Sequence, residues 1–453
     1  MTERSDDEVE LLATARALCD RARPGERIEV LLSRGTGTSV KVFGGEVESF
    51  TSAGASGAGI RVIRDGRQGF AHCGSLDRDV LDDTLAEARD NHSFAEPDEF
   101  NGLAEPDGVD PVEIDHWSDA VLATGPDRKI ELALELERRV TGLDPRVASA
   151  RSTAYGDGWS VFALASTEGI EVTSRGASCS MSTQPLARDG DETQTGWSYD
   201  AARDPDALDI ERTAAEAVER ATRLLGATKP ATSKRTILLE PRLASMLLGI
   251  VSGMLCGDRV VKGRSPFADR VGEQVASPYL TVADDPTRTE SLAADEFDGE
   301  GLACRRNPLI VDGVLQGFLH DSYSARRSGT ASTGSAVRGT RSLPGVGAQL
   351  LVMEPGTRSF EELIASIDHG LYVTSFAGLH SGVNPTSGDF SVGADGLLIE
   401  RGQLAGPARE MTVASTLQRL LLDIREVGGD FEWLSGGDGV CSLVIDDVSV
   451  AGS

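Results

Sequence analysis

The pattern of apolar and polar positions divides the N-terminal half of the chain into alternating helices and strands. Apolar residues recur at helical spacing in four stretches, which predict helices at 6–23, 76–91, 126–140 and 210–225. Shorter apolar runs predict strands at 28–32, 40–50, 59–63 and 69–72, and several short strands between 147 and 199. Gly35-Thr36-Gly37 is interpreted as a turn between the first two strands, and Asp65-Gly66 as a tight hairpin turn.

The C-terminal half has a different pattern, in which short apolar runs predominate. A helix predicted at 241–255 is followed by short apolar runs, which predict strands at 309–311, 314–319, 350–353, 371–374 and 397–400. Asp312-Gly313 and Asp395-Gly396 are interpreted as turns, 415–427 as a helix and 442–450 as a last strand. We therefore expect an α+β fold, with an N-terminal α/β region and a C-terminal domain rich in antiparallel strands.

Two polar stretches mark the expected boundaries. Residues 96–115 contain eight acidic residues and no Lys or Arg, and are expected to form an exposed loop that buries little. Residues 227–233 are rich in Thr, Ser and Pro, as linkers often are. The chain is thus divided into an N-terminal region, 1–226, with room for two subdomains split near 92–116, and a C-terminal domain, 234–453.

The formal net charge of this 453-residue chain is −28. Such a charge argues against binding to nucleic acid, which requires a basic surface, and against binding to anionic membranes. No apolar run is long enough to predict a membrane-spanning helix, and Met1–Asp7 lacks the features of a signal peptide. A cytoplasmic location is expected. The six cysteines are scattered and predict isolated thiols.

The usual catalytic motifs are missing from the sequence. None of the six histidines precedes a glutamate or has a second histidine four or five positions away, so no zinc helix is predicted. Serine-nucleophile and P-loop signatures are also missing. His320 beside Asp321 leaves open an unconventional catalytic pair, although a polar strand end is the favoured interpretation.

A change of charge along the C-terminal half is also notable. Seven acidic residues lie between 284 and 300, and six arginines lie between 305 and 341. These arginines could bind a peptide carboxylate, because guanidinium groups bind carboxylates through two hydrogen bonds. Pairing with the preceding acidic residues is the favoured interpretation.

Three blocks in the C-terminal half carry a family resemblance. They are FDGEG at 297–301 with PLIVDGVL at 308–315, SYSA at 322–325 with STGSAVR at 332–338, and VNPTSGDFS at 383–391. In this order they resemble the TldD/PmbA family of peptidase-complex proteins. The segment 59–70 is similar to the same family, so the resemblance covers most of the chain.

This resemblance implies one of two branches. TldD-like members carry a zinc-binding His-Glu-x-x-x-His motif on a helix, whereas PmbA-like (TldE-like) members lack it and pair with a TldD-like chain. Aligned on the family's landmarks, the two histidine positions correspond to Leu248 and Gly253 and the glutamate position to Gly249. Leu and Gly side chains cannot coordinate zinc, so neither a metal nor a catalytic residue is expected in this chain.

The resemblance therefore implies a non-catalytic, PmbA/TldE-like subunit of a zinc metallopeptidase that acts on unfolded or leader peptides, with zinc in a TldD-like partner. The residues expected to face the peptide are Ser332, Thr333, Gly334, Arg338, Asn384, Gly388, Asp389 and Phe390. Glycine and asparagine at these positions equally suit tight turns. The alternative function is a standalone homodimer that binds peptides or acts as a scaffold without peptidase activity.

Overall fold

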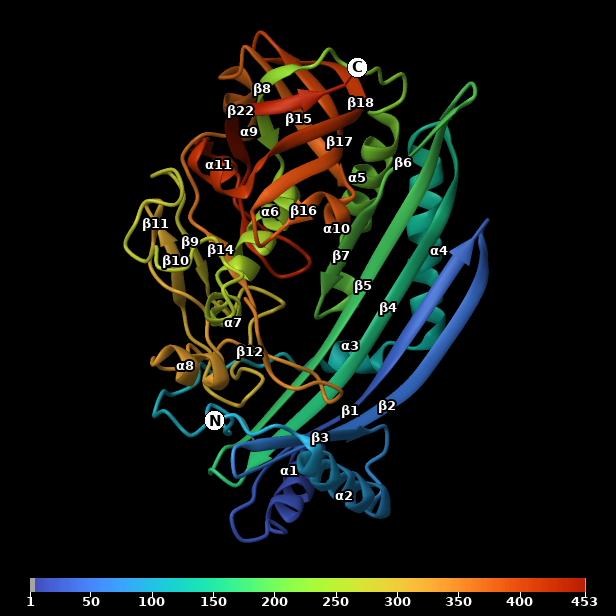
Figure 1. The fold of residues 1–453 in the computed structure, drawn as a ribbon. Coiled ribbons are helices and arrows are strands. Elements are labelled where there is room, and N and C mark those ends of the chain that lie inside the picture. Colours follow the sequence, from blue (N-terminus) through green and yellow to red (C-terminus); the bar gives the residue numbers. More distant parts are fainter. Residues whose placement is uncertain (1–4, 453) are drawn as a thin grey trace.

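The computed structural model describes residues 5–452, so residues 1–4, on which the argument against a signal peptide partly rests, lie outside it. The fold is α+β, as the sequence predicts. Figure 1 shows the N-terminal half built on long, slanting strands, with the C-terminal half beside their middle and upper parts. Within the described range, no helix is both long and apolar enough to cross a membrane.

One seven-stranded antiparallel sheet forms the N-terminal half. Its order is β3-β2-β1-β4-β5-β6, with β7 also on β5, and the strands are β1 (Arg27–Phe43), β2 (Glu46–Arg64), β3 (Arg67–Cys73), β4 (Val147–Ser166), β5 (Glu171–Asp189), β6 (Glu192–Thr195) and β7 (Ser198–Ala202). The Asp65-Gly66 hairpin turn is confirmed, with both residues at positive φ. Strands β1–β3 precede the acidic stretch at 96–115 and strands β4–β7 follow it, so both sides of this stretch contribute to one sheet.

The prediction of short strands in this half is wrong. β4 and β5 have 20 and 19 residues, and β1 continues through Gly35-Thr36-Gly37 to a turn at Gly44 and Gly45. A Cβ atom on Gly35 would lie 2.4 Å from the carbonyl oxygen of Trp159. Glycine at this position therefore allows close approach of the neighbouring strand instead of forming a turn.

Helices cover both ends of this sheet. α1 (Asp6–Cys19) and α2 (Arg78–Phe94) pack at one end, over a core that includes Leu11, Ile28 and Leu85. α4 (Pro126–Leu143) and α5 (Ile210–Thr222) pack at the other, over a core that includes Leu136 and Tyr155. The four predicted helices of this half are confirmed within a few residues at their ends. The short α3 (Asp119–Ala123) and the 3₁₀ turn η1 (Pro205–Ala207) complete it.

The acidic stretch at 96–115 contains no helix or extended strand and is mostly exposed, as predicted, but residues 102–104 are buried. Leu103 and Ala104 are 2% and 1% exposed. The Arg326 guanidinium, from the C-terminal half, donates hydrogen bonds to the carbonyl oxygens of Phe100, Gly102 and Leu103. The stretch is therefore attached to the C-terminal half by its backbone and its few apolar side chains.

The C-terminal half contains a small closed barrel and a second sheet. The barrel order is β15-β8-β22-β18-β17, and it closes because β15 also pairs with β17. Its sheet consists of β8 (Ser233–Leu239), β15 (His369–Ala377), β16 (Val383–Asn384), β17 (Asp389–Glu400), β18 (Gln403–Thr416), β19 (Ile424–Val427) and β22 (Leu443–Ala451). The second sheet has the order β11-β10-β9-β14-β21-β20. Its strands are β9 (Val282–Asp284), β10 (Asn307–Val311), β11 (Val314–Leu315), β14 (Leu351–Met353), β20 (Glu432–Trp433) and β21 (Gly439–Val440).

One large core joins these sheets to the helix α6 (Pro241–Met254). The smaller elements are α7 (Gly257–Val261), α8 (Ser322–Ser328), β12 (Ala336–Val337), β13 (Gly345–Val346), α9 (Phe360–Ala365), α10 (Leu379–Gly382) and α11 (Leu417–Leu422). Two predictions here are wrong. Asp395-Gly396 lies inside β17 at an irregularity in register instead of a turn, and 415–427 divides into α11 and β19.

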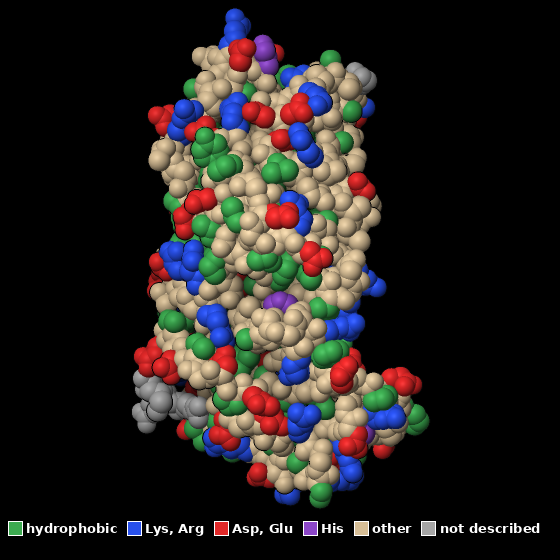
Figure 2. All heavy atoms as spheres, turned by 60° about the vertical axis from the view of Figure 1, so that its left-hand side comes forward, with side chains coloured by type: hydrophobic (Ala, Val, Ile, Leu, Met, Phe, Trp, Pro, Cys, Tyr) green, Lys and Arg blue, Asp and Glu red, His purple; other side chains and the backbone are tan. Residues whose placement is uncertain are grey.

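Basic and acidic side chains lie side by side on one face of the molecule. On the face shown in Figure 2, Lys and Arg side chains are interspersed with Asp and Glu instead of forming one basic patch. A nucleic-acid-binding face gathers its basic residues into a patch or stripe, so this face lacks that signature.

Candidate functional site

The helix α6 has one buried and one open face. Pro241 occupies its first turn, where the missing N–H of proline costs no hydrogen bond. Leu243, Leu247, Leu248 and Val251 point into the C-terminal core. The opposite face lines two hollows, and its positions follow helical spacing: Arg242, Ser245, Met246, Gly249, Ser252, Gly253 and, just beyond the helix, Cys256.

The first hollow, which we call the α6 cleft, has a volume of about 420 Å³. Its walls are the second half of α6, the segment 346–351, two residues of α7 (Asp258 and Arg259), and Asp438. Apart from the helix's own backbone, no atom of the described residues lies within 4 Å of a Cβ built on Gly249 or Gly253. These two glycines therefore leave open the space that larger side chains would fill.

The second hollow, which we call the aromatic pocket, has a volume of about 670 Å³ and lies along the first half of α6. Its lining comes from β7 and the residue before it, α5, α6, the segment 290–292 and the segment 432–438. Three aromatic side chains contribute, Trp197, Tyr199 and Trp433. The central region of the chain and the C-terminal domain thus build this pocket together.

Asp438 lines both hollows and connects them. Its carboxylate accepts hydrogen bonds from the Ser245 hydroxyl (2.6 Å) and the Leu351 backbone N–H (3.0 Å). Burial raises the pKa of Asp438, while these two hydrogen bonds oppose the rise. The α6 cleft and the aromatic pocket thus adjoin at Asp438 along one face of α6, and we refer to the two together as the groove.

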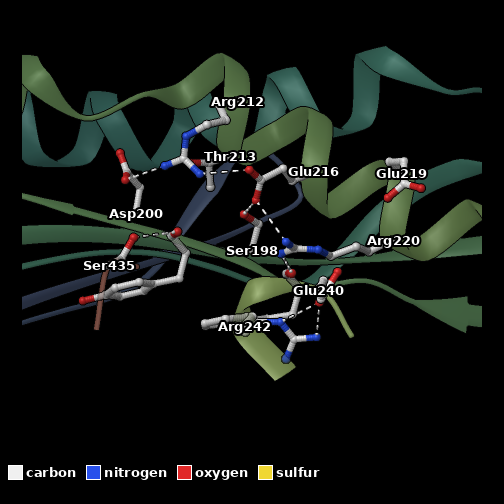
Figure 3. A network of polar contacts seen from close by, with 12 residues as sticks. Ser198, Asp200, Arg212, Thr213, Glu216, Glu219, Arg220, Glu240, Arg242 and Ser435 are labelled. Atoms are coloured by element: carbon white, nitrogen blue, oxygen red, sulfur yellow. Dashed lines mark hydrogen bonds and ion pairs between the residues drawn. The ribbon is translucent and has the colours of Figure 1, made fainter. Parts of the chain in front are cut away.

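A network of ion pairs forms the α5 wall of the aromatic pocket (Figure 3). Glu216 lies between Arg212 and Arg220, with N–O distances of 3.0 and 3.4 Å, and also accepts a hydrogen bond from Ser198. Arg212 reaches Asp200 at 2.6 Å. Each arginine of this wall therefore already has a carboxylate partner, so its charge is paired within the protein.

Metal binding has no support in the groove. Within the described part of the chain, no three His, Cys, Asp or Glu side chains form a group that could hold a metal ion. Of the positions aligned with the zinc motif, Leu248 is 1% exposed in the core, whereas Gly249 and Gly253 face the cleft. Burial, followed by the nearby Asp258, raises the pKa of the Cys256 thiol to about 12, so this thiol is no ready nucleophile.

The predicted peptide-facing residues do not line the groove. Ser332 and Thr333 donate hydrogen bonds from their hydroxyls to the carbonyl oxygen of His320. Gly334 has a φ of 67°, and a Cβ there would lie 2.7 Å from the Ala303 carbonyl oxygen. The contacts of this block therefore shape a turn.

The second block also forms a turn. The Asn384 side chain accepts hydrogen bonds from the backbone N–H groups of Thr386 and Ser387, and Gly388 has a φ of 87°. Asp389 accepts a hydrogen bond from Ser387, and Phe390 is 2% exposed in the core. These contacts fit the alternative interpretation of the block as a tight turn, between β16 and β17.

Arg338 lies inside the contact between the two halves of the molecule. Its side chain is 2% exposed and lies 2.5 Å from Glu29 of β1, which is 1% exposed. Arg61 of β2 also pairs with Glu29, at 3.2 Å, and with Glu300, at 3.5 Å. Four buried charged groups thus connect the N-terminal sheet to the C-terminal half, and the Arg338 side chain is one of them.

The other arginines of the predicted cluster have similar structural partners. Arg305 pairs with Asp107 of the acidic stretch, and Arg327 donates a hydrogen bond to the Tyr323 hydroxyl. Among the ion pairs that this cluster forms within the described residues, only that of Arg306 involves an acidic residue of 284–300, Asp285, at 3.8 Å. The favoured interpretation, pairing with those acidic residues, is therefore wrong for most of the cluster.

His320 and Asp321 have structural contacts as well. Asp321 is the N-cap of α8 and accepts a hydrogen bond from the Ser324 N–H. The His320 ring lies 3.1 Å from the Ser324 hydroxyl and is buried, which lowers its pKa. Neither residue lines the groove.

Apart from Gly249 and Gly253, the residues that line the groove were missed by sequence reasoning. Trp197, Glu432, Trp433 and Asp438 come from segments that carry no motif. The one available signal was that Trp197 and Trp433 are two of only four tryptophans in the chain. Their proximity arises only from the packing of β7 against the C-terminal domain.

Comparisons with known proteins match nearly the whole chain. Domain models of the PmbA/TldA metallopeptidase match residues 28–91 (domain 1), 120–225 (central domain) and 232–452 (C-terminal domain). The metalloprotease PmbA of Escherichia coli O157:H7 is 29% identical over 449 residues, which cover 98% of this chain and 96% of that protein.

Two further relatives agree. A PmbA homologue from Haemophilus influenzae is 25% identical over 443 residues, covering 95% of this chain and 93% of that protein. The crystal structure of TldE from Thermococcus kodakarensis superposes with a TM-score of 0.86 at 25% identity. That superposition covers 98% of this chain and 99% of the TldE chain.

Proposed function

The chain belongs to the PmbA/TldD metallopeptidase family, and from this membership we propose that it is a non-catalytic subunit of a zinc metallopeptidase. In this proposal it binds an unfolded or leader peptide and pairs, in the cytoplasm, with a TldD-like chain that carries the zinc.

The open face of α6 is the observation that carries this proposal. At Gly249 and Gly253 the helix presents only hydrogen atoms to a cleft of about 420 Å³. A metallopeptidase needs ligands that hold zinc and a base that activates the zinc-bound water. Glycine supplies neither, but it leaves space in which an extended peptide can lie.

The N-terminal sheet offers a surface for the partner. β3 pairs with β2 only from Ala58 onward, so residues 46–57 of β2 have no partner strand on that side among the described residues. Residues 46–56 are exposed, and the arm carries the exposed apolar side chains of Phe43, Val47 and Phe50. Exposed strand edges with apolar side chains are typical protein-binding surfaces. We assign this arm, residues 43–57, to contact with the partner subunit.

A reconstitution experiment tests the proposal. The chain and a TldD-like protein from the same genome are purified separately, and zinc content and cleavage of an unfolded peptide are measured for each alone and for the mixture. We expect zinc in the TldD-like chain, co-elution of the two chains on size exclusion, and cleavage only by the mixture.

Three outcomes contradict it. Stoichiometric zinc in this chain, or cleavage by this chain alone, would show that it is itself catalytic. A homodimer that binds peptide and does not co-elute with the TldD-like protein would favour the alternative, a standalone peptide-binding or scaffold protein.

A further inference from the structure

The aromatic pocket carries an excess of negative charge. Its lining includes five acidic residues, Asp200, Glu216, Glu290, Glu432 and Asp438, and three arginines, Arg212, Arg220 and Arg242. Whether the pocket favours an anion or a cation depends on which of these charges are already paired.

Each of the three arginines already pairs with a carboxylate. Arg212 and Arg220 are held by Glu216, and Arg220 also donates a hydrogen bond to the Trp197 carbonyl oxygen at 2.9 Å. Arg242 pairs with Glu240 at 2.9 Å and donates to the Thr374 carbonyl oxygen. An anionic ligand would therefore have to displace existing carboxylate partners.

Two acidic groups of the pocket form no ion pair among the described residues. Glu432 forms no ion pair with any described residue, and Asp438 is held only by the neutral donors of Ser245 and Leu351. Glu432 lines the pocket and is exposed, yet burial of its carboxyl raises its pKa. Repulsion from Glu216, Asp430 and Glu240 raises this pKa further, and the more distant Arg220 opposes the rise. A cation beside this carboxylate would relieve that repulsion.

The aromatic side chains suit the same kind of ligand. Trp197 is 46% exposed, and its ring lies parallel to that of Tyr199, with centroids 5.9 Å apart. The Arg288 guanidinium already lies over the Trp433 ring at 5.3 Å from its centroid. Aromatic faces combined with carboxylates attract ammonium and guanidinium groups.

We propose that the aromatic pocket binds a cationic group of the peptide, namely a lysine or arginine side chain or an N-terminal ammonium. This inference rests on the proposed function, because the peptide is the molecule that would lie in the adjoining α6 cleft. Glu432 supplies the charge, and Trp197 supplies the exposed aromatic face. Asp438, between the two hollows, marks where the peptide would pass from one to the other.

Matched peptides test the inference on the full chain. An unfolded peptide with one lysine is compared with the same peptide carrying norleucine, which has the same length without the charge, each with a free or an acetylated N-terminus. We expect the lysine peptide to bind roughly tenfold more tightly by fluorescence anisotropy at 0.15 M salt, as for a charge-assisted hydrogen bond. The acetylated forms distinguish a side chain from an N-terminal ammonium as the bound group.

Variants test whether the preference for the lysine peptide depends on the aromatic pocket. Glu432→Gln is expected to remove most of the lysine preference, and Trp197→Ala to weaken lysine-peptide binding roughly threefold to fivefold. Glu87→Gln, which removes one exposed charge on α2, is the matched control for the attraction between a basic peptide and an acidic protein. It is expected to leave the preference unchanged.

A small probe separates this inference from the proposed function. Nα-acetyl-lysine methylamide, with its norleucine counterpart, is titrated while tryptophan fluorescence is followed in the wild type and in Trp197→Phe. A Trp197-dependent signal specific to the lysine compound supports the cation pocket even if no peptide binds, in which case the proposed function fails alone. Peptide binding that changes neither between lysine and norleucine nor between a free and an acetylated N-terminus overturns the inference and leaves the proposed function standing. Lack of binding by both peptides and probe overturns both.

Discussion

Three glycines near the end of α6 show how the surroundings of a residue decide its role. Gly249 and Gly253 lie on a helix face that borders open space, so they shape a cleft wall. Gly257 lies just beyond the helix, where a Cβ would approach the His320 ring to 2.1 Å. The first two positions tolerate a side chain, whereas the third requires glycine for close packing.

This contrast predicts opposite effects of the same substitution. Gly253→Ala is expected to stabilise the protein by ~0.5–1 kcal/mol, because alanine restricts the unfolded chain and meets no atom in the cleft. Gly257→Ala, the matched control, is expected to destabilise it by ~1–3 kcal/mol through the clash with His320. Urea denaturation measures both. Equal destabilisation by the two changes would mean that the cleft beside Gly253 is closed.

At the scale of elements, buried ion pairs connect strands from distant parts of the sequence. β1 contributes Glu29, β2 contributes Arg61, and Arg338 follows β12 directly. Breaking a buried pair leaves a charge without a partner, which costs more than the pair itself contributes. The contact between the halves therefore depends on all members of the cluster being present.

Arg338→Ala is expected to destabilise the protein by ~3–5 kcal/mol, because Glu29 would lose its closest partner in a buried site. Arg341→Ala provides the control, since Arg341 is exposed and its loss is expected to change the free energy of unfolding by less than ~0.5 kcal/mol. Urea denaturation and limited proteolysis measure the two variants. Similar stabilities would argue against a structural role for the Arg338 pair.

The exposed arm of β2 gives a second prediction at this scale. Phe50→Glu is expected to weaken co-elution with a TldD-like partner roughly tenfold or more, because it places a charge in an apolar contact. Phe94→Glu alters an even more exposed phenylalanine, on α2 outside the arm, and is expected to have no effect. Size-exclusion titration measures both. Equal loss in the two variants would place the partner surface elsewhere.

At the scale of the whole molecule, the net charge of −28 includes carboxyl groups inside the fold. Burial raises the pKa of Asp284 and Asp295 to about 6, and that of Asp298 to about 7. In the unfolded chain these carboxyls lose their protons near pH 4. The folded state therefore holds more protons between pH 4 and 7, and stability from these groups is lost as pH rises through that range.

We accordingly expect a higher urea midpoint at pH 5.5 than at pH 7.5. His116 and His320, whose pKa values are lowered by burial, oppose this trend below about pH 6.5, so the carboxyl effect needs to be isolated. Asp284→Asn keeps an oxygen for the Gln349 and Leu350 N–H groups and removes the titration. It is expected to reduce the difference between the two pH values by ~1 kcal/mol. An unchanged difference would assign the pH dependence to other groups.

The sequence by itself determined the features that depend on neighbouring residues. Helical periodicity located α1, α2, α4, α5 and α6, and the Asp-Gly pairs at 65–66 and 312–313 marked turns that require positive φ. The ordered C-terminal blocks identified the family, and the residue types at 248, 249 and 253 cannot coordinate zinc wherever they lie.

Only the tertiary structure decided the features that depend on distant residues. The strands were predicted too short because glycines such as Gly35 were interpreted as turns. Gly35 instead allows a neighbouring strand to approach closely, and the local sequence does not reveal that neighbour. Glu29 and Arg338 are paired across 309 positions, and Trp197, Glu432 and Asp438 meet only when the central region packs on the C-terminal domain. The zinc-motif positions were thus identifiable from residue chemistry, whereas the groove beside them exists only in three dimensions.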